Sequence, residues 1–152
     1  MLKKLITFSA ILCTGQAWAA CVDGAAGPNG VDSATEGSTC DNSGTSYIGN
    51  NTAYASGSGS VLNFLPGTVI SSKGVAAVYT LAVGGVNSGG SIPGAGATVH
   101  AKGDLTVNGN ALGSTRSIFI FSGTDAGGKR NSLQIDGNLT ATRTGGLYGA
   151  VI

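Results

Sequence analysis

Few side chains in this sequence could do acid–base or metal chemistry, and they are spread along the chain. The only histidine, His100, lies between Val99 and Ala101, and no cysteine, glutamate or second histidine is close to it in sequence. An isolated imidazole of this kind is usually solvated, so we expect neither a metal ligand nor a general base. The charged residues around it are scattered: Asp104, Arg116, Asp125, Lys129, Arg130, Asp136 and Arg143. The sequence therefore predicts no catalytic residues, no metal site and no cofactor.

The elements that must position these residues repeat. The segment Gly103-Asp104-Leu105-Thr106-Val107 returns further along the chain as Gly137-Asn138-Leu139-Thr140-Ala141. At the same offset, Val99-His100-Ala101 returns as Leu133-Gln134-Ile135. Apolar and polar residues alternate on both sides of a short polar break, which is the pattern of two strands around a turn. His100 falls on the polar side of its strand and is expected to point outward.

The break between the two strands has the composition of a turn. We expect Gly103 and Gly137 to supply backbone with positive φ, and Asp104 and Asn138 to close local hydrogen bonds. Asp136, which precedes Gly137, is expected in the same structural role. These five positions are therefore interpreted as structural turn residues, and a catalytic pair of aspartates is not expected.

A third strand completes the repeat. Residues 117–122, Ser-Ile-Phe-Ile-Phe-Ser, are β-branched and aromatic and lie between the two copies, with glycine-containing segments on either side. Three short strands per repeat, each turning apolar residues inward, predict a right-handed parallel β-helix in which coil stacks on coil. A β-sandwich built from the same strands is the alternative, because period-2 patterning and turns fit both architectures.

Earlier segments resemble a degenerate coil. Residues 61–65 and 68–70 flank the turn Pro66-Gly67, and residues 75–83 alternate apolar and polar side chains. Residues 84–96 hold six glycines and are predicted to be a loop that leaves the stack. Residues 42–60 are rich in Ser, Gly, Asn and Thr and predict an irregular cap with a first edge. We therefore expect a cysteine-loop and polar cap over 20–60 and about two or three coils over 61–152.

The chain begins with the pattern of an export signal. Lys3 and Lys4 precede an apolar run from Leu5 to Cys13, and Ala17-Trp18-Ala19 fits a cleavage site before Ala20. The apolar run is too short to span a bilayer. Residues 1–19 are therefore predicted to be a signal peptide that engages the export machinery.

Removal of the signal sets the charge of what remains. Loss of Lys3 and Lys4 from the eight basic residues leaves six against seven acidic ones, a formal net charge of −1. Nucleic-acid and anionic-membrane surfaces need a clustered basic face, so neither partner is expected. No other stretch approaches transmembrane length, and the glycine-rich, charge-poor composition suits one turn-dense β domain.

Two cysteines remain after the signal, Cys21 and Cys40. In an oxidising compartment they are expected to pair, and a bridge that closes a loop of about twenty residues contributes roughly 3 kcal/mol. The alternative is lipidation of Cys21, because Ala19-Ala20-Cys21 also resembles the end of a lipoprotein signal. Lipidation would anchor the protein to a membrane and leave Cys40 unpaired.

Polysaccharide-acting β-helix enzymes are the enzyme class with which this pattern must be compared. Lyases of that class need clustered carboxylates for calcium and a basic residue on an outer strand. The sequence shows no such cluster, although stacked coils can bring distant residues together. Three or more acidic and basic groups converging on one outer strand face would favour such an enzyme, or a remnant of one.

The signal ending Ala17-Trp18-Ala19-Ala20, the pair Cys21 and Cys40, and the Gly-Asp/Asn-Leu-Thr coils together resemble the N-terminal part of the passenger domain of pertactin-like autotransporters. The resemblance covers most of the chain after the signal. It implies a β-helix displayed at the outer surface of a Gram-negative bacterium, with an adhesin or related virulence-associated function and with host-cell surface or extracellular-matrix ligands. No catalytic residue follows from it, because the matched positions are structural.

The sequence departs from that family at its end. The family continues into a membrane β-barrel, whereas residues 147–152, Leu-Tyr-Gly-Ala-Val-Ile, are expected to enter another strand without a closing cap. We therefore expect a fragment of such a passenger that is exported and lies in the periplasm, at the cell surface or outside the cell.

Overall fold

The computed structural model describes residues 21–22, 32–35, 37–49, 53–72, 79–84, 95–109 and 116–144. The predicted signal peptide with its cleavage site at Ala19 and Ala20 lies outside the described residues, and so does the segment 147–152 that is expected to enter a further strand.

The described residues form thirteen short strands, of which twelve wind as four coils of three. A two-residue strand, β1 (Cys21–Val22), precedes the first coil and pairs antiparallel with its first strand. The first coil consists of β2 (Asp32–Thr35), β3 (Thr39–Asp41) and β4 (Ser46–Gly49), and the second of β5 (Ala53–Ser56), β6 (Val61–Phe64) and β7 (Thr68–Ser72). The third consists of β8 (Tyr79–Val83), β9 (Thr98–Ala101) and β10 (Leu105–Gly109), and the fourth of β11 (Arg116–Ile120), β12 (Ser132–Ile135) and β13 (Leu139–Arg143).

The corresponding strands of successive coils build three sheets. Sheet A has the order β1-β2-β5-β8-β11, sheet B the order β3-β6-β9-β12 and sheet C the order β4-β7-β10-β13. All pairs between coils are parallel. Leu105 lies opposite Leu139, and Val99 opposite Leu133, so the repeat read from the sequence is the register of the stack.

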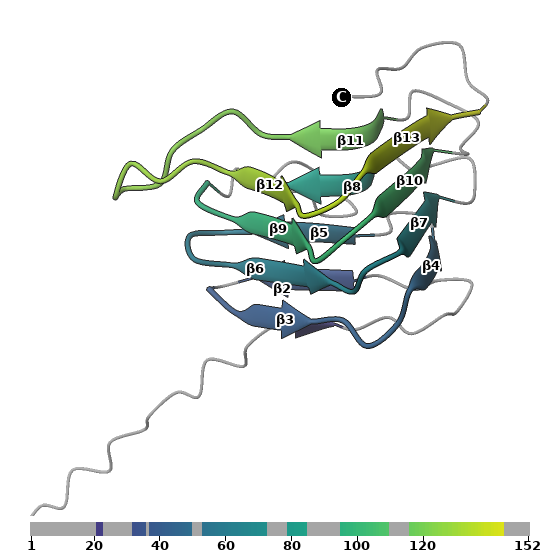
Figure 1. The fold of residues 1–152 in the computed structure, drawn as a ribbon. Coiled ribbons are helices and arrows are strands. Elements are labelled where there is room, and N and C mark those ends of the chain that lie inside the picture. Colours follow the sequence, from purple (N-terminus) through teal and green to yellow (C-terminus); the bar gives the residue numbers. More distant parts are fainter. Residues whose placement is uncertain are drawn as a thin grey trace, which may run out of the picture.

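The coils wind in the right-handed sense. In Figure 1 the strands of sheet B run from left to right at the front, sheet C leads to the back, and sheet A returns behind while the chain rises from coil to coil. The predicted right-handed parallel β-helix is confirmed, and the alternative β-sandwich is wrong. The parallel pairing decides between them, because a sandwich of this kind is built from antiparallel sheets.

The core is a column of stacked side chains that range in size from alanine to Phe64 and Tyr47. Residues at equivalent positions stack directly, as in the column Cys40, Leu62, Val99 and Leu133 of sheet B. The buried apolar residues are Ala34, Cys40, Tyr47, Ala53, Ala55, Leu62, Phe64, Ile70, Leu81, Ala82, Val83, Ala97, Val99, Ala101, Leu105, Val107 and Ile118. Each coil therefore covers the apolar side chains of its neighbours, which is the source of stability in a solenoid.

The polar segment before residue 61 is more regular than its composition predicts. The expected irregular backbone over 42–60 is wrong, since this segment holds β4 and β5 and supplies Tyr47, Ala53 and Ala55 to the core. The narrow interior accepts alanine, and the buried hydroxyl of Ser60 donates to Ser56 O at 2.6 Å and accepts from Gly37 N at 3.0 Å. Small residues that satisfy their own polar groups therefore replace large apolar ones here.

Candidate functional site

The corner between sheets B and C holds the turn residues identified from the repeat. Gly103 and Asp104 join β9 to β10, and Gly137 and Asn138 join β12 to β13 one coil above. The Asp104 carboxylate accepts hydrogen bonds from Asn138 N at 2.7 Å and from Asn138 Nδ2 at 3.1 Å. Asp104 therefore fastens the turn of the next coil.

The physical reasons expected for these turn residues need correction. Neither Gly103 nor Gly137 has positive φ. They are glycines because the coils approach closely: a Cβ on Gly137 would overlap Asp104 Oδ1 and lie 2.6 Å from Asp104 N, and one on Gly103 would lie 2.7 Å from Pro66 Cβ. The hydrogen bonds of Asp104 also link coils, whereas local bonds were expected.

His100 points outward from sheet B, as its place in the strand predicts, but it has a partner. Its Nε2 lies 2.9 Å from Asp136 Oδ2 in the coil above, and the two side chains are 28% and 59% exposed. Gln134 is the residue directly opposite His100, so Asp136 contacts the imidazole from a position two residues further along the chain than Gln134. The repeat places the two residues on adjacent coils, although they are far apart in the linear sequence.

A second polar group lies on the same face of sheet B. Asp41 accepts a hydrogen bond from Asn63 Nδ2 at 2.9 Å and pairs with Lys102 Nζ at 3.3 Å. The Asn63 amide, and next the Lys102 ammonium, hold the pKa of Asp41 below its ordinary value. Asn63 lies opposite Asp41 in one direction and opposite His100 in the other, so the two polar groups share one outward column.

The outer face of sheet B thus gathers two carboxylates, one imidazole and one ammonium: Asp41, His100, Lys102 and Asp136. This is the convergence that the sequence could not show, and it is the feature that would favour an enzyme. The four groups form two acid–base pairs on an exposed surface, His100 with Asp136 and Lys102 with Asp41, so each carboxylate already has a basic partner. Within the described residues, no three His, Cys, Asp or Glu side chains are close enough to hold a metal ion.

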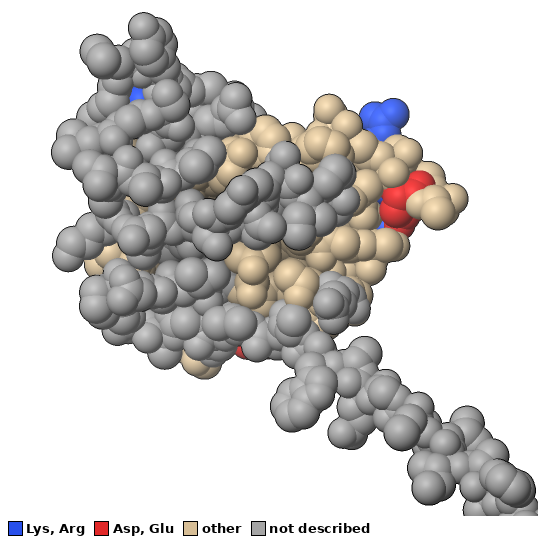
Figure 2. All heavy atoms as spheres, turned by 180° about the vertical axis from the view of Figure 1, so that it is seen from behind, with Lys and Arg blue, Asp and Glu red and all other residues tan. Residues whose placement is uncertain are grey.

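The remaining charged residues named from the sequence lie apart from this face. Asp125, Lys129 and Arg130 belong to a projecting segment between β11 and β12, and Arg143 ends β13. Seen from behind, the described surface is largely uncharged, and a cationic and an acidic group lie together on the edge from which that segment projects (Figure 2).

Cys40 is buried in β3 and is disulfide-bonded. β1, which contains Cys21, contacts β3 and pairs with β2, and Cys21 lies opposite Ala34. The side chain of Cys21 lies outside the described part of the structure, so the pairing of Cys21 with Cys40 stays a prediction.

Comparison with known proteins finds no relative of this chain, because no family model, no curated protein and no solved structure matches it. Among the described residues there is also no helix with the length and apolar character needed to cross a bilayer.

Proposed function

We propose that this protein is a non-enzymatic, exported β-helix that serves adhesion or display at the cell surface or outside the cell. The observation that carries the proposal is the order of segments along the chain: the pattern of an export signal, two cysteines and then coils whose Gly-Asp/Asn-Leu-Thr repeat coincides with the stacking register. A stack of parallel strands whose sheet C has a neutral polar outer face suits presentation of a surface to a partner. The resemblance to pertactin-like passenger domains supports the same role.

The proposed partners are host-cell surface or extracellular-matrix ligands. Short outward columns of Thr, Ser and Asn run across sheet C, where Thr142 Oγ1 donates to Asn108 Oδ1 at 2.6 Å and Asn108 Nδ2 donates to Ser71 Oγ at 3.3 Å. Such a neutral polar face can make many weak hydrogen bonds without the cost of burying charge.

Two measurements test display and adhesion separately. The full chain, produced with its signal in a Gram-negative host, should appear in the periplasm, at the surface or in the medium, and its product should start at Ala20. Purified protein should then be titrated onto immobilised matrix proteins and cultured host cells, with heat-unfolded protein as the control. Retention in the cytoplasm with an intact signal would contradict export, and equal binding by folded and unfolded protein would contradict adhesion.

A polysaccharide-acting enzyme, or a remnant of one, is the second candidate because of the paired groups on sheet B. His100 with Asp136 could act as a base, and Lys102 could stabilise negative charge on a substrate. Incubation with acidic and neutral polysaccharides, followed by detection of new reducing ends, tests this candidate. Cleavage that disappears in Asp136→Asn and persists in Thr140→Ser, an outward substitution on sheet C, would favour the enzyme over the display protein.

A further inference from the structure

The segment 121–131, which we call the strap, leaves the top coil between β11 and β12 and folds back on itself. It is visible in Figure 1 as the light green excursion at the left of the stack. Thr124 and Arg130 form an antiparallel bridge, and Asp125 N donates to Lys129 O at 3.0 Å. The strap is therefore a small hairpin whose two arms face each other.

The strap is fastened to the lower coils at two points. Asp125 Oδ2 accepts a hydrogen bond at 2.5 Å from the hydroxyl of Ser58. Ser58 lies two coils below, in the turn between β5 and β6. Asn131 donates from Nδ2 to Phe121 O at 2.9 Å and accepts at Oδ1 from Ala97 N at 2.9 Å. The hydroxyl of Ser58 holds the pKa of Asp125 below its ordinary value, so the tether is ionised at neutral pH.

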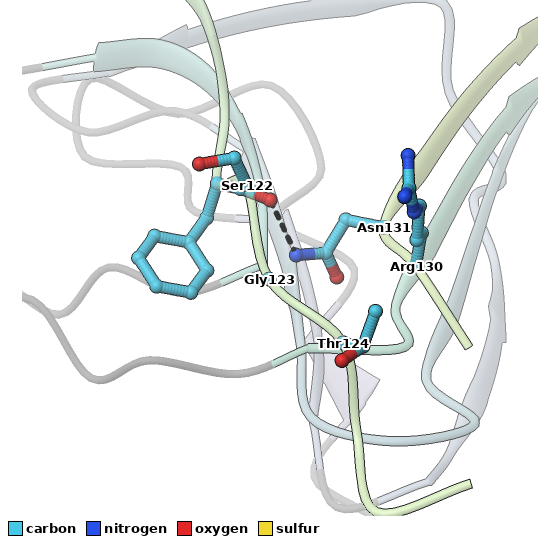
Figure 3. A pocket seen from close by; sticks show the side chains of 6 residues that line it. Ser122, Gly123, Thr124, Arg130 and Asn131 are labelled. Carbon is cyan, nitrogen blue, oxygen red and sulfur yellow. Dashed lines mark hydrogen bonds between the residues drawn. The ribbon is translucent and has the colours of Figure 1, made fainter. Parts of the chain in front are cut away.

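A partly open cavity of about 380 Å³ is lined by residues from both arms of the strap. Its described lining consists of Phe121, Ser122, Gly123, Thr124, Arg130 and Asn131. Figure 3 shows Ser122, Gly123 and Thr124 on one arm and Arg130 with Asn131 on the other, with the dashed hydrogen bond of Asn131 between the arms. This volume falls in the range of small-molecule sites, roughly 300–1,000 Å³.

The lining combines three kinds of chemistry. The Phe121 ring packs on Gly123, where an added Cβ would lie 2.7 Å from the ring, and it stays partly exposed. Ser122 and Thr124 contribute exposed hydroxyls. Within the described residues, the exposed Arg130 guanidinium has no acidic partner, whereas Asp125 is occupied by Ser58 and by the amides of the strap.

Each of these groups matches one part of a carboxylated sugar. A guanidinium binds a carboxylate through two parallel hydrogen bonds. The C–H face of a pyranose ring is apolar and can cover an aromatic ring, while its hydroxyl edge needs small hydrogen-bonding partners. Because Asp125 and Asn131 fix the arms, little of the binding free energy is spent on ordering the site.

We propose that the strap cavity binds a pyranose that carries a carboxylate, with Arg130 on the carboxylate and Phe121 under the ring. The role of this sugar as an adhesion ligand rests on the proposed function, whereas its binding to the cavity in solution does not. The shared chemistry covers uronic acids and sialic acids, which the test distinguishes.

The test is a titration of the full exported chain, labelled with nitrogen-15 and followed by amide chemical shifts. D-Galacturonate, D-glucuronate and N-acetylneuraminate are the probes, and D-galactose and acetate are the partial probes. At least one acidic sugar should give saturable shifts that are largest in the strap. Galactose and acetate should each bind at least about tenfold more weakly, because each supplies only half of the contacts.

Two matched variants separate a specific contact from net charge. Arg130→Gln should weaken binding of the acidic sugar by about tenfold or more, whereas Lys129→Gln, which removes the same charge from an exposed neighbour outside the lining, should change it less than about twofold. Phe121→Leu keeps an apolar side chain in place and should weaken acidic sugars and galactose alike. An unchanged spectrum of the core amides verifies that each variant is folded.

The proposal is overturned if none of the acidic sugars binds saturably, if acetate binds as tightly as they do, or if the Arg130 and Lys129 variants lose affinity equally. These outcomes leave the proposed function standing, because an exported β-helix can adhere through its sheet faces without this cavity. Conversely, a protein that binds the sugar but fails to adhere to cells would refute the adhesion part of the proposed function and leave the sugar site standing.

Discussion

Replacement of Gly137 by alanine should loosen the top coil from the coil below it. A Cβ at this position would overlap Asp104 Oδ1, lie 2.6 Å from Asp104 N and lie 2.7 Å from Gly103 C. Two of these three atoms belong to the backbone of a neighbouring coil, which cannot rotate away as a flexible side chain could. The coils must therefore separate locally.

The size of the effect follows from two contributions. Overpacking against a rigid neighbour typically costs about 1–3 kcal/mol. Displacement of the Asp104 carboxylate also weakens its hydrogen bonds to Asn138, at 2.7 and 3.1 Å, and in this exposed corner we take about 1 kcal/mol for that loss. The free energy of unfolding should fall by about 2–4 kcal/mol in total.

The matched control is Gly127→Ala in the strap. Gly127 also lacks positive φ, and a Cβ there would meet only Asp125 Oδ1, at 3.3 Å. Its effect should stay within about 1 kcal/mol. Urea unfolding followed by circular dichroism measures both variants, and amide hydrogen exchange in β13 reports whether the loss is confined to the top coil. A Gly137→Ala protein whose stability equals that of the parent, with unchanged exchange in β13, would refute the close-approach argument.

Three further perturbations test other parts of the stack. Because the pKa of Asp125 is lowered in the folded protein, the ionised carboxylate stabilises the fold fully above about pH 4, and this stabilisation is lost as the pH falls through the lowered pKa. In acid, the free energy of unfolding of Asp125→Asn should therefore depend less steeply on pH than that of the parent protein. Tyr47→Phe should lower the free energy of unfolding by about 1–3 kcal/mol, because the buried hydroxyl donates to Gly44 O at 2.8 Å and accepts from Gly44 N at 3.0 Å; thermal unfolding measures it. Mass spectrometry should find Cys21 bonded to Cys40, and reduction should lower stability by about 3 kcal/mol; a lipid on Cys21 would contradict both.

The repeat made most of the coil architecture predictable. Its offset, which carries Leu105 onto Leu139 and Val99 onto Leu133, is reproduced by the pairing of β10 with β13 and of β9 with β12. In a parallel stack each strand residue lies directly opposite the equivalent residue of the next coil, so the sequence offset of the repeat gives the register of the sheets. The same reasoning located β6 and β7. It failed for β4 and β5, since no equivalent repeat exists there and small residues gave no apolar signal.

The expectation of about two or three coils over 61–152 agrees with the eight strands described from β6 to β13, and the stack is longer because β2 to β5 precede residue 61. Val61 of β6 lies opposite Thr39 of the coil before it and opposite Thr98 of the coil after it, and it is much nearer in sequence to Thr39. The loops that join the strands of the first coil are short, so its sequence does not share the offset of the later repeat and resembles a cap. Coil length varies with the loops at the corners, whereas the strands keep their positions, and only the strands carry a periodic signal.

The candidate site was less predictable than the fold because its contacts are diagonal. Direct register predicts that His100 meets Gln134, and it does, but the ionisable partner is Asp136, two positions further on. Lys102 reaches Asp41 over an intervening coil. Long side chains cross from one coil to another at angles that the repeat does not encode.

The corner residues show how function and stability can be separated in this fold. Asp104 and the two glycines tie adjacent coils together, and Asp125 with Asn131 ties the strap to coils below it, so both sets of contacts act between coils. In a solenoid the strands of each coil pair only with those of the neighbouring coils, and a stable stack can carry different loops on the same corners. The outer column of sheet B and the strap cavity lie outside the core, so their side chains can change without altering the column of apolar residues that holds the coils together.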